Sequence, residues 1–158
     1  MIRIQGKQIL AADRIEVWQL LTDMDRLSKI APRISKVEDK GALEYVAYSK
    51  VHIGKLKGSV KANLQFADIT PPDSYVLKIM HKNFLGRAFA DMLIELKSIR
   101  EGSHTEISFS GDLKMTGLFG KLEPHIKQET IEGLTKQMFA ELGRELKKDI
   151  KERELVAV

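Results

Sequence analysis

The chain has 158 residues, of which 43% are hydrophobic and 30% charged, a composition typical of globular proteins rather than of disordered or fibrous ones. We therefore expect one domain over residues 1–158. With 26 Lys and Arg against 22 Asp and Glu, the net charge of +4 is too small to indicate a nucleic-acid partner. The absence of cysteine excludes disulfides, thiol nucleophiles and thiolate metal sites.

The sequence shows neither a targeting segment nor a membrane-spanning one. No apolar run approaches the roughly 20 residues that a helix needs to cross a bilayer, and the start MIRIQGKQIL lacks the charged-then-apolar layout of a secretory signal. We expect a cytoplasmic protein, and peripheral attachment to the inner face of the membrane stays open.

The first part of the chain predicts a strand and two short helices. Ile2 to Leu10 is expected to form the strand. Asp13 then precedes an apolar stretch and has Glu16 three positions on, a capping-box pattern that predicts a helix start. A second helical segment is expected over Asp25 to Ile30, and it should end there because Pro32 disfavours helix in the residue before it.

Alternation of apolar and polar residues predicts strands through the middle of the chain. Ile34 to Glu38 and Leu43 to Ile53 are expected to come first. Val60 to Phe66 alternates strictly, which is typical of a half-buried strand. Two prolines and an aspartate stop that strand before Tyr75 to Met80 resumes the extended pattern. Val60 to Phe66 and Tyr75 to Met80 should pair with each other as a large antiparallel hairpin.

Two further alternating segments, Arg87 to Lys97 and Thr105 to Met115, complete a sheet of about seven strands. After Gly117 the apolar period becomes helical and predicts one long amphipathic helix from about Pro124 onward. We place Pro124 in the first turn of that helix, where its missing amide proton costs little. Leu118 to Leu122 should form a separate turn before it.

The order of these elements requires the long helix to cover the apolar face of the sheet. The family resemblance is carried by three segments: ADRIEVWQLLTDMDRL, VHIGKLKGSVKANLQFADITPPDSYVLKI and GSHTEISFSGDLKMTGLFGKL. They resemble the START-like, or SRPBCC, superfamily and, within it, the CoxG family of carbon monoxide dehydrogenase subunits. The resemblance implies an α+β helix-grip fold, in which a curved antiparallel sheet wraps around a long C-terminal helix and two short helices follow the first strand.

The resemblance also carries functional expectations. Members of the superfamily hold a hydrophobic molecule between the sheet and the long helix. Proteins similar to CoxG are linked to molybdenum-containing dehydrogenases and to membrane-associated electron transfer. For this chain the resemblance therefore implies a lipid- or quinone-like ligand, with an oxidoreductase complex of the CO dehydrogenase type or a membrane surface as a further partner. We expect no bound cofactor.

The residues themselves allow a ligand site on the inward face of the sheet, where small side chains alternate with large ones. Strand alternation and the apolar stripe of the last helix give the expected ligand-binding residues, which are Tyr45, Ala47, Ser49, Leu64, Phe66, Leu77, Ile79, His81, Ala88, Ala90, Met92, Phe109, Met115, Leu134 and Met138. Small residues opposite a helix leave space for a ligand. The alternative is that neighbouring large side chains fill the space, because protein interiors are close-packed.

The sequence offers no catalytic constellation and no metal site. It lacks the GxSxG, GxxxxGK[ST], GxGxxG and HExxH motifs. His81 is the histidine that alternation turns inward, where it could orient a ligand carbonyl or hydroxyl together with Tyr45 and Ser49. It could equally be satisfied by a neighbouring backbone group. We expect a binding protein, and the alternative is a polyketide cyclase- or hydrolase-like enzyme that acts on an apolar substrate with His81 as its acid–base residue.

A third possibility is an accessory factor that docks on an oxidoreductase or a membrane through the basic end of the last helix. Lys147, Lys148 and Lys151 supply that charge. Acidic residues are interleaved with these lysines, so an ordinary solvated helix face is the alternative interpretation.

Overall fold

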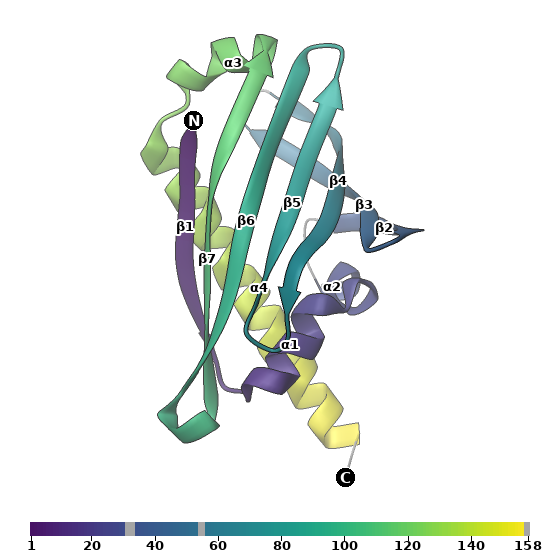
Figure 1. Cartoon of the computed structure of the whole chain (residues 1–158), viewed down its shortest axis with the longest axis vertical. Coiled ribbons are helices and arrows are strands. Elements are labelled where there is room, and N and C mark those ends of the chain that lie inside the picture. The colour runs from purple at the N-terminus through teal and green to yellow at the C-terminus, as the bar shows by residue number, and fades with distance from the viewer. Residues whose placement is uncertain (31–33, 54–55, 157–158) are drawn as a thin grey trace.

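The chain folds into a seven-stranded antiparallel sheet with helices on one side (Figure 1). The computed structural model describes residues 1–30, 34–53 and 56–156. Positions 30, 51–53, 56–58, 134, 135, 138, 139, 142 and 154–156 are described by their backbone alone. The elements in chain order are β1 (Ile2–Leu10), α1 (Arg14–Thr22), α2 (Met24–Ile30), β2 (Ile34–Gly41), β3 (Glu44–Ile53), β4 (Leu56–Thr70), β5 (Ser74–Asn83), β6 (Gly86–Ile99), η1 (Arg100–Gly102), β7 (His104–Gly117), α3 (Leu118–Leu122), η2 (Glu123–His125) and α4 (Gln128–Val156).

The strand order across the sheet is β1-β7-β6-β5-β4-β3-β2. Consecutive strands from β2 to β7 are joined as neighbours, and β1 closes the other edge by pairing with β7. This arrangement confirms the predicted sheet, the two short helices after the first strand and the α+β fold class. The large hairpin is β4 with β5, in which Phe66 lies opposite Leu77 and Leu64 opposite Ile79.

Local sequence signals explain where the first helices begin. Asp13 is the N-cap of α1, and its Oδ1 accepts a hydrogen bond from the Glu16 backbone N–H at 2.9 Å. Asp23 does the same before α2, accepting from the Arg26 N–H at 3.1 Å. Each cap satisfies a backbone donor that has no partner within its own helix.

One helix boundary differs from the prediction. Pro124 lies in the 3₁₀ turn η2 and not in the first turn of the long helix, which begins at Gln128. The turn closes when the Ile126 N–H donates to the Glu123 carbonyl at 3.0 Å. Ile126 then takes an extended conformation, with φ −96° and ψ 115°, and this breaks the helical path. Leu118 to Leu122 does form the separate turn that the sequence predicts.

The main core fills the end of the sheet beneath α1 and α2. Four aromatic rings meet there: Tyr75 lies 5.5 Å from Trp18 and 5.1 Å from Phe66, and Phe66 lies 5.8 Å from Tyr45, measured between centroids. The Tyr75 hydroxyl donates to the Leu21 carbonyl at 3.2 Å. Burial raises the pKa of Tyr75, so the hydroxyl keeps its proton for this bond.

Helix α4 crosses the same face of the sheet, running along β1 and reaching α2 (Figure 1). Leu146 and Ile150 on its C-terminal half are buried in the main core. Gly143 permits close approach to β1, because a Cβ there would come within 2.8 Å of the Gln8 side chain. Among the helices that the structure describes, none has both the length and the apolar composition that a bilayer crossing requires.

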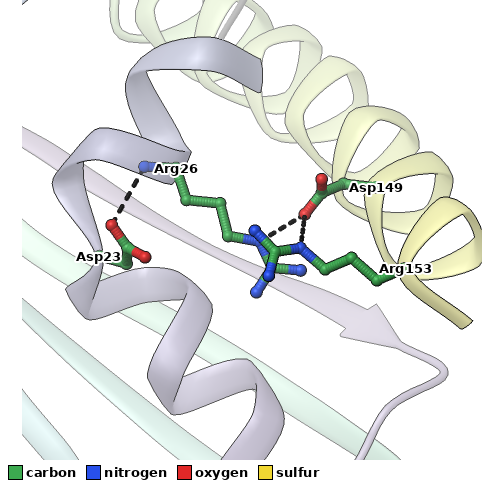
Figure 2. A network of polar contacts seen from close by, with 4 residues as sticks. All are labelled: Asp23, Arg26, Asp149 and Arg153. Atoms are coloured by element: carbon green, nitrogen blue, oxygen red, sulfur yellow. Dashed lines mark hydrogen bonds and ion pairs between the residues drawn. The ribbon is translucent and has the colours of Figure 1, made fainter. Parts of the chain in front are cut away.

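An ion pair joins α4 to α2, as Figure 2 shows. The Arg26 Nε donates to Asp149 Oδ2 at 2.5 Å, and the two side chains are only 10% and 19% exposed. Arg153 approaches the same carboxylate oxygen at 3.4 Å from the solvent side. The C-terminal half of α4 is therefore held both by apolar burial and by a largely buried charge pair.

Candidate functional site

A cavity of about 460 Å³ lies on the face of the sheet that α4 crosses, next to the main core. Residues from five strands form the described lining, with β5 and β6 contributing most. These residues are Ile4, Val60, Ala62, Leu77, Ile79, His81, Ala88, Phe89, Ala90, Met92, Ile94, Phe109 and Leu113. Within this described lining, His81 is the one residue whose side chain carries nitrogen or oxygen atoms for hydrogen bonding.

The hollow exists because several residues that line it have small side chains and because two large side chains lie flat along the sheet. The Phe109 ring crosses onto β1, where a Cβ on Gly6 would collide with its Cζ. The Met92 Sδ occupies the corresponding space above Gly111, 2.5 Å from where a Cβ would stand. Because both large side chains are buried against the strands, they do not fill the volume above the sheet.

The inward face is thus divided into a packed end and a hollow end. Ala90, Met92 and Phe109 form a small cluster of their own, separate from the main core. Leu77, Ile79 and Ile94 contact both clusters. The question that the sequence leaves open, a filled core or a pocket, therefore has a different answer at each end of the sheet.

The hydrogen bonds of His81 define its tautomer. Nδ1 lies 2.8 Å from the Lys61 carbonyl oxygen, which can only accept, so Nδ1 carries the proton. Nε2 lies 3.3 Å from the Asn83 amide nitrogen, and the Asn83 Oδ1 accepts from the Leu85 N–H at 2.8 Å. The amide orientation is therefore fixed, and Nε2 accepts. The Phe119 ring of α3 lies 5.9 Å from the imidazole.

The structure brings together seven of the residues expected to bind a ligand. Those seven line the cavity and are Leu77, Ile79, His81, Ala88, Ala90, Met92 and Phe109. The sequence-based set leaves out six described lining residues, namely Ile4, Val60, Ala62, Phe89, Ile94 and Leu113. Alternation alone gives Val60, Ala62, Ile94 and Leu113, which share a face with chosen residues. Ile4 requires the pairing of β1 with β7, which local sequence does not reveal.

The other expected residues lie elsewhere. Tyr45, Ala47, Leu64 and Phe66 belong to the main core or pack against it. Ser49 of β3 and Met115 of β7 are half-buried outside the described lining. The side chains of Leu134 and Met138 on α4 fall outside the described part of the chain.

A second hollow, also about 460 Å³, lies on the opposite face of the sheet. Val46, Met80 and Phe89 border it in one row across the strands, together with charged side chains of both signs. Val46 is buried there although alternation places it outward. The mixed charge around this hollow selects no single class of ligand.

Comparison with known proteins identifies the family. Residues 6–147 match the family model that describes CoxG, a subunit of carbon monoxide dehydrogenase. The chain belongs to the CoxG family. No curated protein matches it.

Solved structures with the same fold cover almost the whole CoxG chain. A conserved protein from Geobacillus kaustophilus is 24% identical, with a TM-score of 0.80 and coverage of 96% of each chain. A START superfamily protein from Mycobacterium smegmatis is 9% identical, with a TM-score of 0.66 and coverage of 95% of this chain and 97% of that one. The Zhui aromatase/cyclase from a Streptomyces species is 11% identical, with a TM-score of 0.57 and coverage of 92% and 88%. These likenesses confirm the START-like fold.

Proposed function

We propose that this CoxG chain acts as a single START-like domain that binds an apolar small molecule, of the lipid or quinone class, in the cavity beside α4. The observation that supports the proposal best is a volume of about 460 Å³ whose described lining is apolar except for His81. Ligand pockets in proteins typically measure about 300–1,000 Å³ and combine apolar walls with a few polar groups. Transfer of an apolar guest out of water would supply most of the binding free energy.

The hydrogen bonds of His81 indicate which polar group a ligand would present to it. Its Nδ1–H already donates a hydrogen bond to the Lys61 carbonyl, so the ring can offer a ligand only the lone pair of Nε2. That lone pair would bind a ligand hydroxyl if the Asn83 amide moved aside, because the existing bond at 3.3 Å is long. We therefore expect the bound molecule to present a hydroxyl to this end of the cavity, as a lipid alcohol or the reduced, quinol form of a quinone would, and not a carbonyl.

Membership of the CoxG family supports a role beside a membrane-linked redox enzyme. A partner of the CO dehydrogenase type is the candidate that the family description suggests. The enzyme alternative, a cyclase- or hydrolase-like activity, has less support, because His81 is the one titratable side chain in the described lining and both of its ring nitrogens are engaged.

The test is to purify the chain from its own host without detergent, extract it with organic solvent and identify the released compounds by mass spectrometry. The expected result is an apolar compound with a hydroxyl group, in an amount comparable to the protein. A protein that repeatedly releases no apolar compound, and that takes up none from a host lipid extract, would contradict the proposal.

A further inference from the structure

The end of the sheet near the hollow exposes large apolar side chains to solvent. Phe84, in the turn between β5 and β6, is 95% exposed, and Leu118 and Leu122 on α3 are each 50% exposed. We call these three residues the apolar tip. They lie at one end of the molecule because the Leu118 N–H donates to the Leu85 carbonyl at 2.7 Å and Gly86 pairs with Gly117. Figure 1 shows α3 and the β5–β6 turn at the same end.

The charged residues within the two segments that form the apolar tip, residues 82–87 and 114–122, are all cationic. Lys82 and Arg87 flank Phe84, and Lys114 and Lys121 bracket the start of α3; all four side chains are exposed. Neither residues 82–87 nor residues 114–122 contain an acidic residue. The two acids that directly flank residues 114–122 are each paired, Glu123 with the amino group of Met1 and Asp112 with Arg3.

We infer that the apolar tip and its four cations dock the protein on an anionic lipid bilayer. Apolar side chains set among cations are what an interfacial membrane surface requires, because the former enter the acyl boundary while the latter bind lipid phosphates. Exposure of Phe84 to water has no role in the fold, since its side chain contacts almost nothing. The combination of exposed apolar side chains with cations favours a lipid bilayer, which offers an acyl layer and phosphate groups at adjacent depths.

This surface adjoins the cavity. Phe119 of α3 contacts the His81 ring, and Ala88, two residues beyond Gly86, lines the hollow. The tip therefore places the hollow end of the sheet toward the bilayer and the packed end away from it. The inference goes beyond the proposed function and does not depend on it, because docking requires no occupied cavity.

Vesicle co-sedimentation tests the inference on the full chain. Vesicles of phosphatidylcholine alone should bind weakly, and vesicles that also contain phosphatidylglycerol should bind strongly, with attachment falling as salt rises. Phe84→Ser should lower the partition coefficient about tenfold. Its matched control is Ile15→Ser on α1, 62% exposed, which should leave binding unchanged.

A second pair of variants tests which cations contribute to vesicle binding. Neutralising Lys82 and Lys121 together, each to Gln, should lower binding to the anionic vesicles about fivefold per lysine. The control neutralises Lys147 and Lys148 on α4 to Gln and should change binding little. Hydrogen exchange with vesicles present should show protection in residues 82–87 and 114–122.

Three results would overturn the inference. One is equal binding of the wild-type chain to neutral and anionic vesicles, or to neither. Another is loss of binding in the α4 variant with retention in the Lys82 and Lys121 variant. The third is protection of α4 alone in hydrogen exchange. Melting curves that match the wild type keep the Phe84→Ser result interpretable, because an exposed side chain contributes little to stability.

Discussion

At the scale of single residues, His81 illustrates what strand alternation can and cannot predict. Alternation places the imidazole on the inward face, and the cavity lining confirms that position. It does not reveal the Lys61 carbonyl or the Asn83 amide as partners, because both bonds depend on β4 and on the end of β5. The interpretation of a histidine satisfied by backbone is thus confirmed, although a ligand contact through Nε2 stays compatible with it.

Substitution of His81 separates a binding role from a catalytic one. We expect His81→Ala to retain an apolar ligand with a loss of affinity of about fivefold, the cost of one hydrogen bond of about 1 kcal/mol. Equilibrium titration with the extracted compound would measure it. An intact affinity combined with complete loss of turnover on an identified substrate would instead favour the enzyme alternative.

Gly111 is a residue at which adding a single methyl group should lower the stability of the fold. In Gly111→Ala the new Cβ would stand 2.5 Å from both the Asp91 carbonyl oxygen and the Met92 Sδ. Because the backbone oxygen cannot yield, we expect a loss of about 1–3 kcal/mol in the free energy of unfolding, measured in urea. Gly133→Ala on α4 is the control, since nothing lies within 4 Å of its Cβ, and it should raise stability by up to about 1 kcal/mol.

At the scale of elements, sequence patterns predict the strands and the first helices because alternation and caps act locally. Asp13 and Glu16 form the predicted N-terminus of α1. The apolar period places the start of α4 too early, since proline is compatible with a 3₁₀ turn as well as with a first helical turn. The extended conformation of Ile126 decides between them, and the period does not encode it.

The Arg26–Asp149 pair gives a test of how α4 is held. Removing Arg26 leaves Asp149 largely buried with only the solvent-side Arg153 as a partner. We expect Arg26→Ala to lower the free energy of unfolding by about 2–3 kcal/mol, somewhat less than for a fully isolated buried charge. Arg153→Ala removes the exposed partner and should cost at most about 1 kcal/mol. Equal effects of the two variants in urea titrations would contradict this account.

At the scale of the whole molecule, the division of one face into a packed and a hollow end could not be predicted from alternation. Phe66 and Ala62 share a strand face, yet Phe66 is buried within the main core, whereas Ala62 lies at the edge of that core and lines the cavity. The difference arises because α1 and α2 cover only one end of the sheet. That placement depends on tertiary contacts such as those of Trp18 and Arg26, which local sequence patterns do not specify.

The measurement that tests the central claim most directly compares two matched alanine variants. Ala88 and Ala67 are both half-buried on strands, but only Ala88 lines the cavity in the described structure. After purification from the host and solvent extraction, Ala67→Leu should release as much apolar compound as the wild-type chain. Ala88→Leu should release several-fold less, because the added side chain occupies ligand volume. Equal recovery from all three proteins, or recovery from none, would contradict a ligand in this cavity.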